Sequence, residues 1–92
     1  MYLMWLINDS KIRKQITKLP KHVQAKYSYW RTFVINDGVE KLSIIRGFNF
    51  EKLSGDRAGQ YSCRLSKGYR VIFEIYKETV TVYVLEVNKH AY

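Results

Sequence analysis

The sequence predicts a small α+β domain: one N-terminal strand, a two-helix hairpin and a three-stranded antiparallel meander. Three observations support this prediction. Apolar residues recur at helical spacing before residue 38 and at strand spacing after residue 60. The chain has 92 residues, which fits a single domain over 1–92 with one core. Because 47% of its residues are hydrophobic and 15% aromatic, it can fill that core.

The first half is predicted to hold the strand and both helices. Tyr2–Ile7 is typical of a short buried strand, and residues 8–10 (Asn-Asp-Ser) offer N-caps for the first helix. Pro20 separates the two helices, and Asn36-Asp37-Gly38 ends the second. Their apolar stripes are Ile12, Ile16 and Leu19 in the first helix and Val23, Tyr27, Trp30 and Val34 in the second.

The second half is predicted to be mostly sheet. Residues 39–59 are expected to be irregular, with a strand or a turn at Leu42–Ile45. Stretches rich in Val, Ile, Tyr and Thr then alternate with turn residues, which is the pattern of an antiparallel meander. The three expected strands are Gln60–Ser66, Tyr69–Tyr76 and Thr79–Asn88.

The turn between the first two of these strands sets their register. A three-residue loop, Ser66-Lys67-Gly68 with Gly68 left-handed, pairs Leu65 with Tyr69 and Arg64 with Arg70, whereas a two-residue loop would mix the two faces. The face toward the core would then carry Tyr61, Cys63, Leu65, Val71, Phe73 and Ile75, and the other face Arg64, Arg70, Ile72 and Glu74.

Two arginines opposite each other repel, so the Arg64/Arg70 pair needs an explanation. In one interpretation, carboxylates such as Glu51 or Glu86 neutralise them. In the other they form a phosphate clamp, because the arginine fork matches phosphate oxygens. Lys67 in the adjoining turn favours the clamp.

The charge balance favours a polyanionic partner. Lys and Arg number 16 against 8 acidic residues, a net charge of +8, and seven of the basic residues lie in the acid-free stretch 10–31. A single cysteine, Cys63, excludes an internal disulfide and a cysteine-based zinc site. No apolar run approaches the roughly 20 residues that span a bilayer, so we expect a cytoplasmic protein without membrane contact.

The C-terminal half carries a family resemblance. The run from Lys52 to Phe73 contains Lys-Leu-x-Gly, a Gly-x-aromatic-x-x-Arg strand, a tight turn and an aromatic-Arg-hydrophobic strand. It resembles the hallmark of the RelE/ParE toxin superfamily, and residues 84–92 resemble that family's last strand and catalytic tail. Over residues 1–50 only the strand–helix–helix order agrees. The resemblance implies a RelE-like fold of the microbial ribonuclease type and a toxin of a bacterial type II toxin–antitoxin module.

The superfamily implies two different activities. The RelE, YoeB and HigB branch resembles metal-independent endoribonucleases that cut mRNA in the ribosomal A site. The ParE branch inhibits DNA gyrase without nuclease chemistry. A third reading is a non-catalytic, basic nucleic-acid-binding domain. We expect the ribonuclease, with a cognate antitoxin, mRNA and ribosomal RNA as partners and with no cofactor.

Metal-free RNA cleavage needs a base for the 2′-hydroxyl, cations for the phosphate and an acid for the leaving oxygen. By resemblance, Glu51 is the candidate for the base, and Arg70 would hold the scissile phosphate. The candidates for the acid are His90, whose ordinary pKa lies near neutrality, and Tyr92. The resemblance does not decide which of these two residues donates the proton. The phosphate-binding candidates are Lys52, Arg57, Arg64, Lys67 and Lys89, and those for docking on ribosomal RNA are Lys11, Arg13, Lys14, Lys18 and Lys21.

Overall fold

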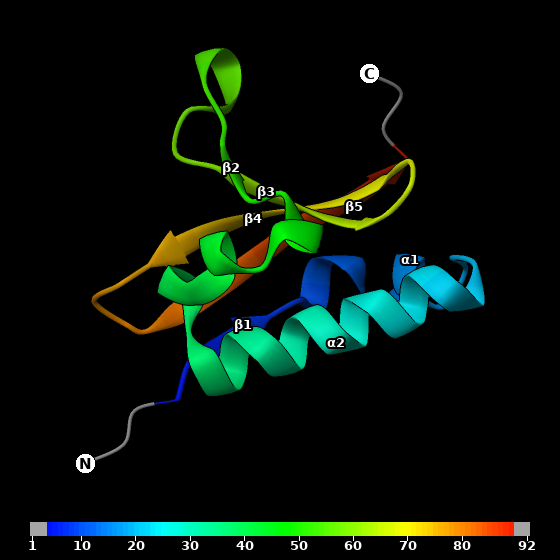
Figure 1. Cartoon of the computed structure of the whole chain (residues 1–92), viewed down its shortest axis with the longest axis horizontal. Helices are drawn as coiled ribbons and strands as arrows, with labels where there is room; N and C mark the ends of the chain where they lie inside the picture. The colour runs from blue at the N-terminus through cyan, green and yellow to red at the C-terminus, as the bar shows by residue number, and fades with distance from the viewer. Residues whose placement is uncertain (1–3, 90–92) are drawn as a thin grey trace.

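The helices of the protein pack against a mixed β-sheet. The computed structural model describes residues 4–89, which form five strands in the order β1-β5-β4-β3-β2 (Figure 1). The strands are β1 (Leu6–Asn8), β2 (Glu51–Lys52), β3 (Tyr61–Ser66), β4 (Tyr69–Tyr76) and β5 (Thr81–Lys89). The helices are α1 (Arg13–Ile16) and α2 (Lys21–Asp37), with short 3-10 helices η1 (Ser10–Ile12), η2 (Val39–Ile44), η3 (Arg46–Phe48) and η4 (Gly55–Arg57).

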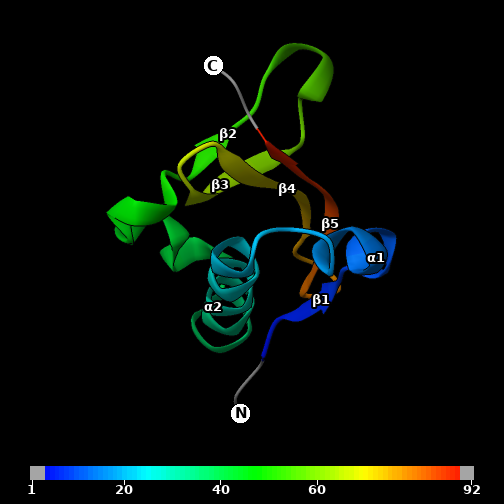
Figure 2. The same ribbon diagram turned by 90° about the vertical axis from the view of Figure 1, so that its right-hand side faces the viewer.

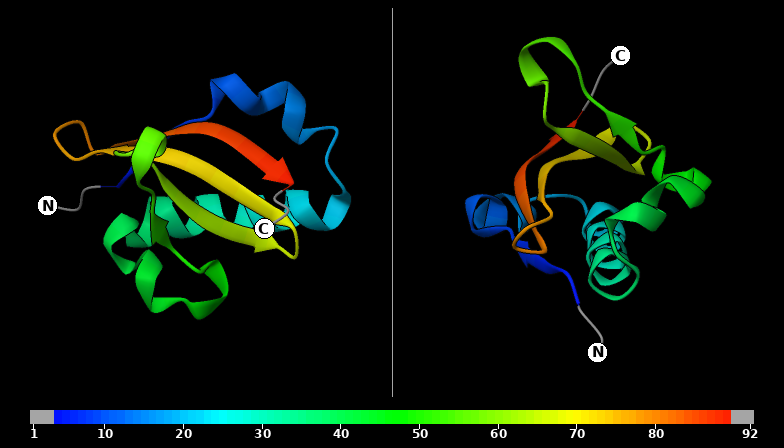
Figure 3. Two further views of the ribbon diagram at one scale, coloured as in Figure 1. Left: turned by 90° about the horizontal axis from the view of Figure 1, so that it is seen from above. Right: turned by 90° about the vertical axis from the view of Figure 1, so that its left-hand side faces the viewer.

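The predicted α+β class and element order are confirmed. Strands β3, β4 and β5 form the antiparallel meander and lie side by side over α2 (Figure 3, left). The N-terminal strand β1 adds to this meander in parallel with β5, so the first and the last strand of the chain are neighbours in one sheet. Among residues 4–89, no helix has both the length and the apolar character needed to cross a membrane.

Helix α2 supplies the helical side of the core. Its predicted stripe is buried, with Val23, Trp30 and Val34 at 0% exposure and Tyr27 at 4%. Trp30 packs on Phe73 of β4, with ring centroids 5.0 Å apart. Figure 2 shows α2 against one face of the sheet and α1 close to β1 and β5. The helical periodicity therefore predicted both the element and the face that it buries.

The first strand and the first helix differ from the prediction. The strand is β1, Leu6–Asn8, and it was wrongly expected to be buried, since Leu6 is 63% exposed. Side chains alternate along a strand, so Ile7 packs against the core while the neighbouring Leu6 meets solvent. The first helix is a 3-10 turn followed by one α-helical turn. Asp9 makes no capping hydrogen bond there because its carboxylate bonds to Tyr27 of α2.

Residues 39–59 contain more structure than the sequence predicted. Leu42–Ile45, expected as a strand or a turn, falls mostly in the 3-10 helix η2, whose Leu42 is fully buried. Phe48 of η3 is also buried, and it contacts Phe33 of α2. The short strand β2, which was not predicted, pairs with β3.

The β3–β4 hairpin has the predicted register with a different turn. Arg64 lies opposite Arg70, as predicted, and Gly68 has the expected positive φ of 87°. The prediction that Leu65 pairs with Tyr69 is wrong: Ser66 pairs with Tyr69, and the register shifts between Arg64 and Ser66. This bulge takes up one residue, so the core face and the outer face stay separate despite the shorter loop.

Gly38, which ends α2, has a backbone conformation and a close neighbour that disfavour any side chain. Its φ of 87° and ψ of 162° belong to a region that essentially only glycine adopts, and an added Cβ would lie 3.0 Å from Trp5 Nε1. We expect Gly38→Ala to lower the free energy of unfolding by about 1–3 kcal/mol, measured by urea denaturation. The control is Gly47→Ala, where a Cβ meets nothing within 4 Å. Equal stability of the two variants would contradict this account.

Candidate active site

The candidate site lies on the sheet face opposite α2. Side chains alternate along β3 and β4, so Cys63 and Val71 face the core while Ser62, Arg70 and Ile72 face the other way. Across β5, Asn88 lies opposite Arg70 and Glu86 opposite Ile72. We call this surface the arginine face and define it by Glu51, Ser62, Arg70, Ile72, Glu86 and Asn88.

Arg70 is buried on this face, which the sequence did not predict. Its side chain is 6% exposed. The guanidinium donates from Nε and Nη2 to Ser62 Oγ, at 3.1 and 2.6 Å, and from Nη2 to the Asn49 carbonyl oxygen at 3.0 Å. Arg70 is thus a fixed side chain and not a solvated one. Ile72, expected on the outer face, is also buried, at 7% exposure.

Segment 49–51 explains this burial. Phe50 stacks on Tyr61, with ring centroids 5.6 Å apart, and this contact holds the segment against β3. Asn49 sits in the left-handed region at φ 42°, and its carbonyl oxygen reaches Arg70. Glu51 lies opposite Ser62 in the sheet, so its carboxylate lies on the arginine face.

The structure brings two predicted catalytic candidates together. Glu51 Oε2 lies 3.7 Å from Arg70 Nη2, within ion-pair distance but longer than a hydrogen bond. The side chains of Glu51 and Arg70 are 44% and 6% exposed, so the carboxylate is the more accessible of the two groups. Such a pair offers a proton acceptor beside a fixed cation.

A second ion pair flanks the first. Arg57 of η4 donates to Glu86 Oε1 at 2.8 Å and to Gln60 Oε1 at 3.0 Å. Asn88 also donates to the Glu86 carboxylate through Nδ2. Of the two opposed arginines, Arg70 therefore has a carboxylate partner in Glu51, whereas Glu86 pairs with Arg57, which does not belong to that pair.

Arg64 does not join this cluster. Although it lies opposite Arg70 in the sheet, it lines a hollow of about 290 Å³ together with Lys26 and Tyr29 of α2 and Phe48 of η3. Lys52 is exposed on β2, and Lys67 is exposed in the β3–β4 turn. Lys89, also exposed, ends β5 opposite Tyr69, one residue from Arg70. His90 and Tyr92 lie outside the described residues.

The residues expected to dock on ribosomal RNA are exposed. They are Lys11 in η1, Arg13 and Lys14 in α1, Lys18 in the connection and Lys21 at the start of α2. Lys11 also lines a hollow of about 560 Å³ with Glu74, Tyr76 and Tyr83.

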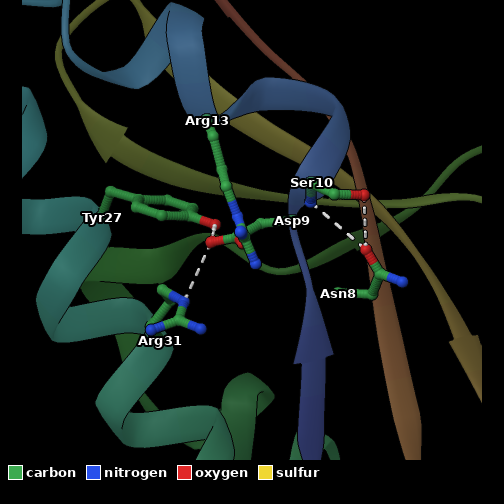
Figure 4. Close-up of polar contacts among 6 residues, drawn as sticks. All are labelled: Asn8, Asp9, Ser10, Arg13, Tyr27 and Arg31. Atoms are coloured by element: carbon green, nitrogen blue, oxygen red, sulfur yellow. Dashed lines mark hydrogen bonds and ion pairs between the residues drawn. The ribbon is translucent and has the colours of Figure 1, made fainter.

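A buried polar cluster that the sequence analysis missed joins the N-terminal segment to α2 (Figure 4). Tyr27 donates its hydroxyl to Asp9 Oδ2 at 2.8 Å, and Arg31 Nε lies 3.1 Å from the same oxygen. Arg13 Nε lies 3.4 Å from Asp9 Oδ1. The sequence held one signal for this cluster: Tyr27 and Arg31 are four residues apart, so they lie on the same side of helix α2, beside its buried stripe.

The cluster shifts two pKa values in opposite directions. Burial by itself raises the pKa of Asp9, but the Tyr27 hydroxyl and the Arg31 and Arg13 guanidinium groups outweigh it and hold that pKa below its ordinary value. Burial and the Asp9 carboxylate raise the pKa of Tyr27. Asp9 is therefore ionised, and Tyr27 is a hydrogen-bond donor to it, over the whole neutral range. This cluster stabilises the fold and lies outside the arginine face.

Within residues 4–89, no three acidic, histidine or cysteine side chains gather closely enough to hold a metal ion. On the arginine face, the buried Arg70 guanidinium lies beside the Glu51 carboxylate, so a fixed cation adjoins a group that can accept a proton. Two residues of this site, Ser62 and Asn49, were missed. The register gave a signal for Ser62, because it lies two residues from Arg64 on the same face.

Comparison with known proteins identifies the architecture. No protein-family model matches the sequence, and no curated protein matches it significantly. The archaeal RelE–RelB complex from Pyrococcus horikoshii matches with a TM-score of 0.71 at 20% identity, over 95% of this chain and 96% of that one. The isolated Escherichia coli RelE toxin matches with a TM-score of 0.64 at 27% identity, over 96% and 86%. The Staphylococcus aureus YoeB–YefM complex matches with a TM-score of 0.66 at 15% identity, over 99% and 100%.

Proposed function

Because the chain has the fold of the RelE/YoeB-like toxin superfamily, we propose that it is the toxin of a bacterial type II toxin–antitoxin module and cleaves mRNA in the ribosomal A site. The observation that carries the proposal is the fixed Arg70 guanidinium beside the accessible Glu51 carboxylate. A buried, oriented cation next to a proton acceptor is what metal-independent phosphodiester cleavage requires.

The proposed reaction starts at the ribose 2′-hydroxyl. Glu51 accepts its proton, and the 2′-oxygen attacks the adjacent phosphorus. Arg70 stabilises the negative charge that builds up on the non-bridging oxygens. His90 donates a proton to the departing 5′-oxygen, and Tyr92 is the second candidate for that role. The products are a 2′,3′-cyclic phosphate and a 5′-hydroxyl end. No metal ion or other cofactor takes part in this proposal.

The remaining cations are proposed to hold RNA. Lys52, Arg64, Lys67 and Lys89 would contact the mRNA backbone, and the exposed basic residues of 11–21 would contact ribosomal RNA. Such contacts are independent of sequence and weaken with salt. Arg57 would exchange Glu86 for a phosphate when mRNA binds.

A protein antitoxin is the second proposed partner. Two of the similar structures are complexes of a toxin with its antitoxin, RelE with RelB and YoeB with YefM. A chain with a net charge of +8 is suited to an acidic antitoxin segment. We place the reaction in the cytoplasm, where ribosomes are found.

One observation favours the alternative of a ParE-like gyrase inhibitor or a non-catalytic basic domain. Both Arg57 and Arg70 already have a carboxylate partner within the chain. In that alternative the arginine face only stabilises the fold, and Glu51 has no chemical role.

Expression in growing bacteria tests the proposal. Wild-type protein should stop growth, and primer extension should show new 5′ ends within translated messages. Glu51→Gln should reduce these cuts by about 100-fold or more, because an amide cannot accept the proton. The control is Glu78→Gln, in the exposed β4–β5 turn. Intact messages together with gyrase-dependent DNA breaks would refute the proposal.

A further inference from the structure

We infer that Ser62, together with the backbone carbonyl of Asn49, is a positioning residue that fixes the orientation of the Arg70 guanidinium. This inference rests on the proposed function, in which Arg70 acts on phosphate. Ser62 would not touch the RNA and would act only through Arg70.

The geometry of Ser62 supports this role. The residue is fully buried at 0% exposure, and its hydroxyl oxygen accepts hydrogen bonds from both Nε and Nη2 of Arg70. The Asn49 carbonyl oxygen accepts a further hydrogen bond from Nη2. Acceptors on two segments, β3 and the residue before Phe50, therefore hold one guanidinium in one orientation.

The chemical nature of these acceptors matters more than their number. A hydroxyl and a carbonyl are neutral, so they orient the guanidinium without forming ion pairs with it. The Glu51 carboxylate lies 3.7 Å from Arg70 Nη2, and the Glu51 side chain is half-exposed. A purely structural arginine would be stabilised better by direct, bidentate contact with that carboxylate. The arrangement keeps the cation and the base side by side but separate.

Loss of the Ser62 hydroxyl should bring the Arg70 guanidinium and the Glu51 carboxylate into direct contact. In Ser62→Ala, Arg70 loses the acceptor of two of its hydrogen bonds, and the guanidinium can turn toward Glu51. A direct ion pair would then occupy both the phosphate ligand and the base. Exposed lysines and arginines carry most of the affinity for RNA, so binding should change little.

The first test is kinetic. For ribosome-bound mRNA, Ser62→Ala should lower kcat by about 10- to 100-fold and change KM by less than about 2-fold. Ser62→Thr keeps the hydroxyl and should retain most of kcat. Ser66→Ala is the matched control, because Ser66 lies on the same strand and its buried hydroxyl has no hydrogen-bond partner among residues 4–89. Equal kcat in wild type, Ser62→Ala and Ser66→Ala would overturn the inference.

A double-mutant cycle shows whether Ser62 acts through Arg70. Lysine cannot reproduce the Nε and Nη2 contacts, so Ser62→Ala should cost kcat less than about 2-fold in an Arg70→Lys background. A loss in that background as large as in wild type would contradict a role through Arg70.

A measurement that does not depend on RNA cleavage tests the positioning role of Ser62 independently of the proposed reaction. In nuclear magnetic resonance spectra, the Arg70 Nε proton should exchange slowly with solvent in wild type and Ser66→Ala and quickly in Ser62→Ala. Binding of inorganic phosphate, followed at the same proton, should weaken in Ser62→Ala. If wild type leaves ribosome-bound mRNA intact while these differences hold, the reaction is wrong and the positioning role stands. Identical exchange in the three proteins would refute the positioning role.

Discussion

Arg70→Lys is expected to lower the rate of mRNA cleavage by about 100- to 1,000-fold. Lysine keeps the positive charge, but its compact ammonium group cannot contact Ser62, Asn49 and a phosphate at once. The charge would remain on the arginine face while the planar fork that matches two phosphate oxygens is lost. Single-turnover cleavage of mRNA on purified ribosomes measures this loss.

The control for this variant is Arg46→Lys. Arg46 is exposed on η3 and has no part in the proposed site, so its replacement should leave the rate within about 2-fold of wild type. Thermal unfolding of both variants shows whether the fold persists. A folded Arg70→Lys protein that cuts as fast as Arg46→Lys would mean that the guanidinium does not hold the scissile phosphate.

Asp9→Ala is expected to lower the free energy of unfolding by about 2–3 kcal/mol at pH 7. The substitution leaves the buried Tyr27 hydroxyl without its acceptor, and a buried unpaired donor is costly. The arginines add less, since the Arg13 and Arg31 side chains are 74% and 37% exposed and can turn to water. Urea denaturation measures the change, and Asp56→Asn in the exposed η4 is the control. Equal stabilities would show that the cluster contributes nothing.

The same cluster predicts a dependence of stability on pH. The pKa of Asp9 in the folded protein lies below its ordinary value of 3.8. A carboxylate with a depressed pKa contributes stability that is fully present above its unfolded pKa and is lost as pH falls through the folded pKa. The stability advantage of wild type over Asp9→Asn should therefore be constant above about pH 5 and shrink below pH 4. An advantage that grows on acidification would contradict the assigned contacts.

The sequence predicted those parts of the fold that depend on local periodicity. The buried stripe of α2 followed from i, i+4, i+7 spacing, and the Arg64–Arg70 register followed from alternation around one turn. Both patterns are complete within about ten to twenty residues. The class and the order of elements then followed from the sum of such local patterns.

The parts that it did not predict depend on contacts between distant residues. Alternation could not show that Leu6 pairs with Thr81, or that β1 is therefore a half-exposed edge strand. Segment 39–59 has no repeat of period 2 or 3.6, because short 3-10 helices and two-residue strands bury single residues such as Leu42. The burial of Arg70 was missed for the same reason, since this aperiodic segment covers it.

For the candidate site, the sequence indicated which residues belong to it better than it indicated the contacts between them. The family resemblance placed Glu51 and Arg70 in one site, and the two side chains do lie within ion-pair distance. No pattern in the sequence indicates that Arg57 pairs with Glu86, because the two residues lie on separate elements, η4 and β5. Ser62 is one of several serines, and only the sheet register distinguishes it.

Cleavage of an mRNA with one 2′-deoxy nucleotide tests the central claim most directly. The substrate is a ribosome-bound message whose A-site codon carries 2′-hydrogen in place of 2′-hydroxyl on the 5′ side of the mapped cut. If the 2′-oxygen is the nucleophile, cleavage at that bond should stop, while the all-ribose message gives a 2′,3′-cyclic phosphate. Cleavage of the deoxy message at the same bond and at the same rate would contradict the account.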